Sequence, residues 1–141
     1  MKYLREFIRY FAINLKKYYL VYFYKMNISH SARISFGAKL DKTNPKGIYI
    51  GPESYVASGA LIFSHDFSTS KMLDTHIGSK CFIGANAIIM PGIKISDEVV
   101  VGSGSVVTKS IPSNVIVAGN PSKIIKDGIK TSKFGKIVKE D

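Results

Sequence analysis

The chain has 141 residues, of which 45% are hydrophobic, and its 20 basic and 10 acidic side chains leave a formal net charge of +10. This length predicts a single domain with enough apolar side chains for a core, and the single cysteine excludes a disulfide within the chain. The positive charge is concentrated at the two ends. Residues 1–25 contain six basic side chains and one acidic one, and residues 122–141 contain six lysines and three acidic residues.

The first segment, residues 1–27, predicts an amphipathic helix with many aromatic side chains. Its apolar residues recur at helical spacing, whereas Lys2, Arg5, Arg9 and Lys16 project from a different face. The apolar residues are Leu4, Phe7, Ile8, Phe11, Leu15, Tyr18, Tyr19 and Tyr22. Two interpretations stay open. The apolar face covers the open end of the following domain or a neighbouring subunit, or residues 1–25 lie in a membrane surface. Scattered charges argue against a signal peptide and against a membrane-spanning stretch of about 20 residues.

A six-residue repeat dominates the middle of the chain. Branched aliphatic residues return every sixth position in three tracts, and a second slot four residues further on contains small or branched side chains. The repeat positions are Ile28, Ile34 and Leu40; Ile50, Val56 and Ile62; and Ile77, Ile83, Ile89, Ile95, Val101 and Val107. A period of six fits neither an amphipathic helix nor an alternating strand. Three such units form one triangular coil, so the repeat predicts a parallel β-helix, although it does not set the handedness.

Extra residues between the tracts predict loops at 41–49 and 64–76 within a β-helix domain that covers residues 28–121. Glycines near the repeat corners are expected to supply turn conformations that other residues reach only with strain. They are Gly51, Gly78, Gly84, Gly92, Gly102 and Gly104. Cys81 occupies a small-residue slot, which favours burial over a nucleophilic role.

The three histidines differ in their positions along the chain. His30 and His76 are expected to be a surface turn residue and a loop-end residue, whereas His65 opens the longer inserted loop. Side chains on loops anchored to a rigid scaffold often carry function, and imidazole can remove a proton near neutral pH. We expect Asp66 or Asp74 to orient its ring; the alternative is a polar turn residue without function. The spacing of the histidines gives no special support to a zinc site, and no metal is expected.

The last segment, residues 122–141, is a basic tail with lysines three or four residues apart. Gly128 and Gly135 interrupt any helix, and no nucleic-acid-binding motif accompanies the lysines, so nucleic acid is not an expected partner.

Residues 75–126 resemble the bacterial hexapeptide-repeat O-acetyltransferases. The resemblance rests on the runs FIGANAIIMPG, GSGSVVTKSIP and VAGNPSKII in this order and spacing. That group includes galactoside and maltose acetyltransferases and the enzymes that acetylate capsule, lipopolysaccharide and exopolysaccharide. The resemblance implies an all-β fold, a left-handed parallel β-helix, together with a homotrimer that has active sites between subunits, acetyl-CoA as donor and a sugar or glycan acceptor. From the single cysteine and the N-terminal segment we expect a cytoplasmic protein, either free or at the inner face of the membrane.

The resemblance assigns roles to individual positions. It makes His65 the general base, in a ternary complex without an acyl-enzyme. The cofactor contacts of the family fall on Ala85, Ser103, Thr108, Lys109, Lys123 and Lys126. The lysines are expected to meet CoA phosphates, and the small residues to leave room for the pantetheine arm.

Several residues depart from the family pattern. Phe82 replaces a more frequent tryptophan, His76 stands where proline is usual, and the SHDF context of His65 differs from that of the galactoside and maltose enzymes. The context favours acetylation of a surface glycan or its precursor. The alternatives are an N-acetyltransferase of an amino sugar nucleotide, a non-enzymatic β-helix scaffold and a zinc enzyme resembling γ-class carbonic anhydrases.

Overall fold

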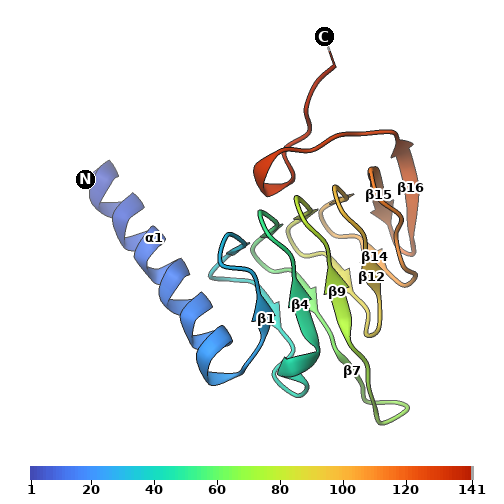
Figure 1. The fold of residues 1–141 in the computed structure, drawn as a ribbon, viewed down its shortest axis with the longest axis horizontal. Helices are drawn as coiled ribbons and strands as arrows, with labels where there is room; N and C mark the ends of the chain where they lie inside the picture. The colour runs from blue at the N-terminus through green and yellow to red at the C-terminus, as the bar shows by residue number, and fades with distance from the viewer. Residues whose placement is uncertain (141) are drawn as a thin grey trace.

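A computed structural model describes residues 1–140 and shows a β-helix of four stacked coils, each built from three short strands (Figure 1). The strands form three parallel sheets, one for each side of the triangle. The first sheet contains β1 (Asn27–Ile28), β4 (Ile48–Ile50), β9 (Thr75–Ile77) and β12 (Lys94–Ile95). The second contains β2 (Arg33–Ile34), β5 (Tyr55–Val56), β10 (Phe82–Ile83), β13 (Val100–Val101) and β15 (Val115–Gly119), and at its edge the antiparallel strand β16 (Ser122–Asp127). The third contains β3 (Lys39–Leu40), β6 (Leu61–Ile62), β11 (Ile88–Ile89) and β14 (Val106–Val107).

The six-residue repeat sets the register between coils. In the first sheet Ile28 pairs with Ile50, Ile50 with Ile77, and Ile77 with Ile95. Ile77 and Ile95 are separated by three uninterrupted repeats. The two earlier pairs are separated by three repeats plus the predicted insertions. Nearly every repeat side chain is buried along the axis of the solenoid, and so is the second slot, from Cys81 to Ile111. The predicted parallel β-helix is therefore confirmed.

Four of the six glycines predicted to supply turn conformations do not have positive φ. Only Gly92 and Gly104 of that set have positive φ, at +79° and +71°. At Gly84 an added Cβ would lie 2.6 Å from the amide nitrogen of Ser103 in the next coil, and at Gly51 it would lie 2.6 Å from the backbone of Gly78. The requirement at these positions is close approach between coils, because neighbouring backbones stack at strand spacing. Left-handed turn positions are instead occupied by Glu53, Lys80, Asn86, Glu98 and Asn114.

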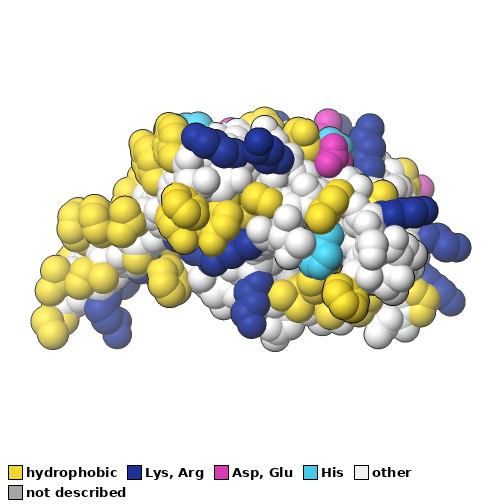
Figure 2. All heavy atoms as spheres, turned by 90° about the horizontal axis from the view of Figure 1, so that it is seen from below, with side chains coloured by type: hydrophobic (Ala, Val, Ile, Leu, Met, Phe, Trp, Pro, Cys, Tyr) yellow, Lys and Arg dark blue, Asp and Glu magenta, His cyan; other side chains and the backbone are white. Residues whose placement is uncertain are grey.

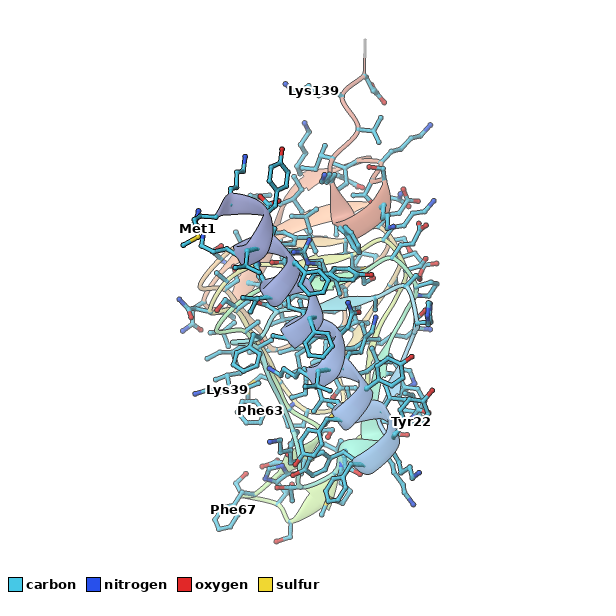
Figure 3. The ribbon with its side chains drawn as sticks, turned by 90° about the vertical axis from the view of Figure 1, so that its left-hand side faces the viewer. Met1, Tyr22, Lys39, Phe63, Phe67 and Lys139 are labelled. Atoms are coloured by element: carbon cyan, nitrogen blue, oxygen red, sulfur yellow. The ribbon has the colours of Figure 1, made fainter. Side chains whose placement is uncertain are left out.

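The N-terminal segment is helical, as predicted. Helix α1 (Lys2–Tyr18) continues into a short π-helical turn, η1 (Tyr19–Phe23), and crosses the open end of the solenoid (Figure 3). Ile13 and Leu20 are buried against the first coil. Between them, the ammonium of Lys17 donates to the carbonyls of His30 (2.7 Å) and Ala32 (2.9 Å). Lys16 likewise donates to the carbonyls of three residues in the first coil, Ser35, Phe36 and Ala38.

These contacts correct one interpretation of the helix. The face of α1 that meets the solenoid is a mixed one, with two lysines between two apolar residues, because the open edge of the first coil presents backbone carbonyls that need donors. Burial lowers the pKa of Lys17 and, together with the charge of Lys42, that of Lys16. The aromatic face does not cover the open end; it points away from the solenoid. None of the helices within residues 1–140 has the length and hydropathy needed to cross a bilayer.

The C-terminal segment is part of the fold. Strand β16 pairs antiparallel with β15, so the boundary expected at residue 122 falls inside a β-hairpin. The chain then runs back along the solenoid through the single-turn 3-10 helix η3 (Lys133–Gly135) (Figure 1). On the way the hydroxyl of Thr131 donates to the carbonyl of Lys80 (2.7 Å), and the amide of Phe134 donates to the carbonyl of Glu53 (2.7 Å).

Candidate active site

His65 lies where the chain leaves the second coil. The corner at which the chain passes from the third sheet to the first contains both insertions, and we call it the loop corner. Its first insertion ends in the single-turn 3-10 helix η2 (Pro45–Gly47). Its second insertion forms a hairpin in which β7 (His65–Asp66) pairs antiparallel with β8 (Lys71–Met72). The backbone of His65 therefore lies at the foot of a hairpin that projects from the coil (Figure 1).

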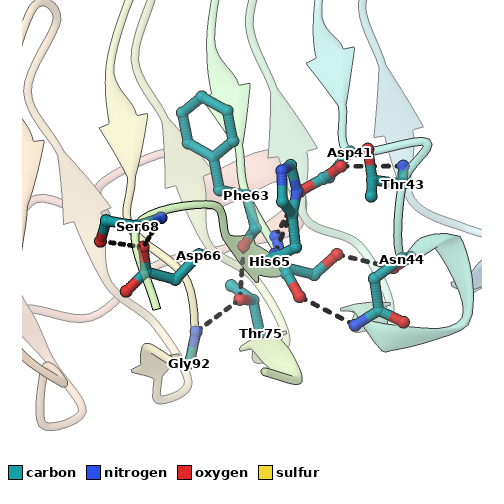
Figure 4. Close-up of polar contacts among 10 residues, drawn as sticks. Asp41, Thr43, Asn44, Phe63, His65, Asp66, Ser68, Thr75 and Gly92 are labelled. Atoms are coloured by element: carbon teal, nitrogen blue, oxygen red, sulfur yellow. Dashed lines mark hydrogen bonds and ion pairs between the residues drawn. The ribbon is translucent and has the colours of Figure 1, made fainter. Parts of the chain in front are cut away.

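The partner of His65 is Asp41, which follows β3 in the coil below. Its Oδ2 atom is hydrogen-bonded to Nδ1 of the His65 ring and also accepts the backbone amides of Ser64 (2.9 Å) and His65 (3.1 Å). Its Oδ1 atom accepts the amide of Thr43 (2.9 Å). Figure 4 shows these contacts. The Asp41 side chain is 4% exposed and that of His65 is 24% exposed, so the carboxylate is enclosed while the ring still reaches solvent.

The contacts of Asp41 set its charge state. Burial raises the pKa of Asp41, but the amide of Ser64, the ring of His65 and the amide of Thr43 together outweigh burial and hold its pKa below the ordinary value. An ionised carboxylate can only accept hydrogen bonds, so Nδ1 of His65 is the donor. In the neutral ring, Nε2 is then left with a free lone pair. The pair therefore presents a proton acceptor in a fixed orientation.

Hydrogen bonds of two buried residues, Ser64 and Thr75, fix the stem of the hairpin to the coils on either side. The hydroxyl of Ser64 donates to the carbonyl of Asn44 (2.6 Å), and the side-chain amide of Asn44 donates back to the carbonyl of Ser64 (2.8 Å). The hydroxyl of Thr75 donates to the carbonyl of Phe63 (2.6 Å) and accepts the amide of Gly92 (3.0 Å). These bonds connect three successive turns of the loop corner (Figure 4), so they limit movement of the backbone that carries His65.

The two aspartates expected to orient His65 are placed elsewhere. Asp66 accepts the amide (2.9 Å) and hydroxyl (2.6 Å) of Ser68 and the hydroxyl of Thr69 (2.8 Å), and these bonds lower its pKa. Its carboxylate thus caps the tip of the hairpin (Figure 4). Asp74 is exposed and lies beside the backbone of Gly47. Because successive residues of a strand point to opposite sides, the neighbour of His65 in sequence points away from its ring.

Asp41 was missed by sequence reasoning, although the repeat contains the signal. Leu40 pairs with Ile62 in the third sheet, so Asp41 lies beneath Phe63, one residue before the second insertion begins. Aligning the tracts by register places an acidic residue under the loop that carries the histidine.

The positions expected to contact the cofactor lie at two corners of the solenoid. Ala85 and Ser103 occupy successive turns between the second and third sheets, and Lys123 is opposite Ala118 in the hairpin above them. Thr108 and Lys109 instead follow β14 at the loop corner, two coils above His65, and both are exposed. Lys126 lies further along β16, opposite Ile116. One chain thus does not bring all six positions to the side of the solenoid where His65 lies.

The remaining reactive side chains lie apart from this pair. Cys81 is buried in the core, and burial raises the pKa of its thiol to about 11. The ring of His76 stacks on Tyr49 with 4.3 Å between centroids. Among residues 1–140 no three metal-ligating side chains converge on one point.

Comparison with known proteins identifies the family. A family model described as the hexapeptide repeat of succinyl-transferase matches residues 75–109. Over 118 residues, which are 80% of this chain and 67% of the relative, the sequence is 30% identical to YvoF of Bacillus subtilis (strain 168), a protein named as an acetyltransferase. The chain belongs to the hexapeptide-repeat acetyltransferases. The resemblance seen in the sequence is confirmed.

Two further similar proteins are a colanic acid biosynthesis acetyltransferase and a maltose O-acetyltransferase. WcaF of Escherichia coli (strain K12), named as a colanic acid biosynthesis acetyltransferase, is 34% identical over 82 residues, which cover 58% of this chain and 45% of WcaF. The crystal structure of a maltose O-acetyltransferase from Clostridium difficile 630 has a TM-score of 0.59 and 26% identity, covering 76% of this chain and 70% of that one. The hexapeptide-repeat chain thus spans two thirds of YvoF and less than half of WcaF.

The same fold occurs with bound CoA. AntD, an N-acyltransferase from Bacillus cereus solved as a point mutant with dTDP-4-amino-4,6-dideoxyglucose and coenzyme A, has a TM-score of 0.56 over 81% of this chain and 87% of its own. At 20% identity this likeness shows the fold alone.

Proposed function

We propose that this protein transfers the acetyl group of acetyl-CoA to a sugar hydroxyl during the synthesis of surface polysaccharide or lipopolysaccharide. The observation that carries the proposal is the contact between His65 and a buried, ionised Asp41 in a chain of the hexapeptide-repeat acetyltransferase family. A carboxylate that holds the Nδ1 proton of a histidine leaves Nε2 ready to act as a general base.

The proposed reaction proceeds in a complex of both substrates. The acceptor hydroxyl oxygen attacks the thioester carbonyl carbon while Nε2 of His65 takes the hydroxyl proton. The tetrahedral intermediate then breaks its bond to sulfur, and the imidazolium returns the proton to the departing thiolate. Asp41 stabilises the positive charge that the ring carries between the two steps. No acyl-enzyme is needed, which agrees with a buried Cys81 whose pKa is about 11.

The split between corners supports a site built from two protomers. Ala85, Ser103 and Lys123 lie around one corner, whereas His65, Thr108 and Lys109 share the loop corner. A cofactor held by both sets requires that the first corner of one protomer faces the loop corner of the next. In the homotrimer that we propose, this arrangement occurs three times, and Lys109, Lys123 and Lys126 meet the CoA phosphates.

The test measures thiol release from acetyl-CoA with a panel of glycan acceptors. We expect His65→Ala to abolish turnover while the variant keeps its oligomeric state and binds acetyl-CoA. His30→Ala is the matched control, because His30 is exposed in the first coil and lies outside the loop corner. Wild-type turnover in His65→Ala contradicts the proposed mechanism. No thiol release and no acetyl-CoA binding by the wild type would favour a non-enzymatic scaffold. Faster turnover with an amino sugar nucleotide than with any hydroxyl acceptor favours N-acetylation, which a histidine base also supports.

A further inference from the structure

Helix α1 has a continuous apolar stripe that points away from the solenoid. The stripe follows alternating steps of four and three residues along Leu4, Ile8, Phe11, Leu15, Tyr18 and Tyr22. These side chains and their aromatic neighbours are each at least 47% exposed. The full set in residues 2–23 is Tyr3, Leu4, Phe7, Ile8, Tyr10, Phe11, Leu15, Tyr18, Tyr19, Tyr22 and Phe23. Figure 2 shows hydrophobic side chains gathered at the end of the molecule where the helix lies.

The opposite face of α1 explains why the stripe cannot turn inward. Ile13 and Leu20 are buried against the first coil, and Lys16 and Lys17 donate to its carbonyls. Rotating the stripe toward the solenoid would break these charge-assisted hydrogen bonds and leave coil carbonyls without donors. The solenoid therefore holds the apolar stripe outward. An apolar patch of this extent is rarely left open to water, because its burial is favourable.

The composition of the stripe favours a lipid surface over a second protein helix. Eight of the eleven exposed apolar side chains in residues 2–23 are Tyr or Phe, and the step pattern places Tyr18 and Tyr22 on the stripe itself. In a dry seam between helices both phenol groups would need hydrogen-bond partners, whereas at a membrane interface they reach head groups and water while their rings contact acyl chains. The two rings are stacked, with 5.3 Å between centroids, and together present one broad apolar face.

Charge complementarity specifies the type of lipid. Residues 1–25 contain six basic side chains and only Glu6 as an acidic one. Two of the six cap the solenoid. The other four are exposed: Lys2, Arg5 and Arg9 on a face of α1 other than the stripe, and Lys25 just after η1. Cations beside a helix that lies in the interface attract anionic head groups. We propose that residues 1–25 bind flat to the surface of an anionic lipid bilayer, with the stripe at the boundary of the acyl chains.

This binding mode sets the position of the loop corner relative to the membrane. The ammonium of Lys42, next to Asp41, lies 5.2 Å from the ring centre of Tyr24 and 5.9 Å from that of Tyr19. The C-terminal end of the helical segment thus contacts the loop that positions His65. If the proposed function also holds, the site lies within reach of an acceptor linked to lipid.

The test is flotation of the full chain with vesicles, independent of any enzyme assay. Wild-type protein is expected to float with phosphatidylcholine vesicles that contain phosphatidylglycerol, less with phosphatidylcholine alone, and less as salt rises. Replacing two stripe residues, Phe11→Glu with Leu15→Glu, is expected to weaken partitioning by about 100-fold, since each apolar side chain contributes about 1.5 kcal/mol or more on burial. Both positions are at least 60% exposed, so the fold should be kept.

A matched control variant introduces the same two negative charges at a site away from the helix. Ile137→Glu with Val138→Glu replaces two exposed apolar residues of the C-terminal segment and should float like the wild type. If both double variants lost flotation equally, net charge alone would explain the effect, and the proposal would be overturned. The proposal would also be overturned if the wild type did not float and instead sedimented as an assembly whose mass falls in the Phe11→Glu, Leu15→Glu variant. That result would assign the stripe to contact with a second copy of the chain.

Discussion

Asp41 and His65 lie 24 residues apart in the chain, yet one carboxylate oxygen of Asp41 accepts both the backbone amide of His65 and its ring Nδ1. The double contact fixes the position of the backbone and the orientation of the ring together. The carboxylate itself is held by amides of two different insertions, those of Thr43 and Ser64. The geometry of the candidate base therefore depends on the stacking of the first two coils rather than on the hairpin alone.

Replacing Asp41 with asparagine keeps a side chain of the same size beside the His65 ring but removes its negative charge. Because an asparagine amide can donate to Nδ1, Asp41→Asn favours the tautomer whose Nε2 carries the proton and cannot accept another. We expect the turnover number for acetyl transfer to fall on the order of 100-fold, with little change in KM for acetyl-CoA. Asp66→Asn is the matched control, since Asp66 caps the hairpin tip and does not contact the ring. A similar loss in both variants would show that hairpin order, and not the tautomer, limits the rate.

The same carboxylate predicts a pH dependence of stability. The pKa of Asp41 is lowered in the folded protein, so ionised Asp41 stabilises the fold. This contribution is fully present above the ordinary carboxyl pKa and is lost as pH falls through the lower folded-state pKa. Urea unfolding of the wild type and Asp41→Asn should therefore differ by about 1–3 kcal/mol at neutral pH and converge in acid. A difference that stays constant with pH would contradict this assignment of charge.

Thr75 should contribute to stability through its hydroxyl. Thr75→Val keeps the shape of the side chain but leaves the carbonyl of Phe63 and the amide of Gly92 without their buried partner. We expect a loss of about 1–3 kcal/mol in the free energy of unfolding. Thr43→Val provides the comparison, since Thr43 is exposed and binds Asp41 through its backbone amide. If both substitutions cost the same, the hydroxyl of Thr75 is not what holds the hairpin stem.

Two glycines should respond differently to alanine. At Gly84 the new Cβ would meet backbone atoms of the next coil at 2.6–2.8 Å, which no side-chain movement relieves. Gly104 has nothing within 4 Å, and only its φ of +71° opposes a side chain. Thermal unfolding should show a cost of about 3 kcal/mol for Gly84→Ala and about 1 kcal/mol for Gly104→Ala. The reverse order would mean that turn conformation, rather than coil spacing, is limiting.

Cys81 should be unreactive in the folded protein. Its thiol is fully buried, has a pKa of about 11, and donates to the carbonyl of Ser96 (3.0 Å). Since the thiolate is the reactive form, labelling by a thiol reagent at neutral pH should proceed only after denaturation. Rapid labelling of the native protein would contradict this account of the core.

The fold could be predicted from the sequence because its determinants are periodic and local. A branched residue at every sixth position, from Ile77 to Val107, is compatible with stacked three-sided coils and with little else. His65 was also visible, because a histidine that opens an insertion stands out against a repeat. The function of most glycines was not visible, since close approach between coils and left-handed turns both select glycine, and only the coordinates distinguish them.

By itself, the sequence determined the coil, its register and the two insertions, because the same side-chain pattern must recur wherever strands stack in parallel. The tertiary structure alone decided which residues are in contact between coils. Asp41, rather than Asp66, contacts the ring of His65, and lysines, rather than aromatic residues, cover the open end of the solenoid. The physical reason is the same in both cases. Buried polar groups need hydrogen-bond partners that are near in space. In a solenoid these partners lie one coil away, which is many residues away in the chain.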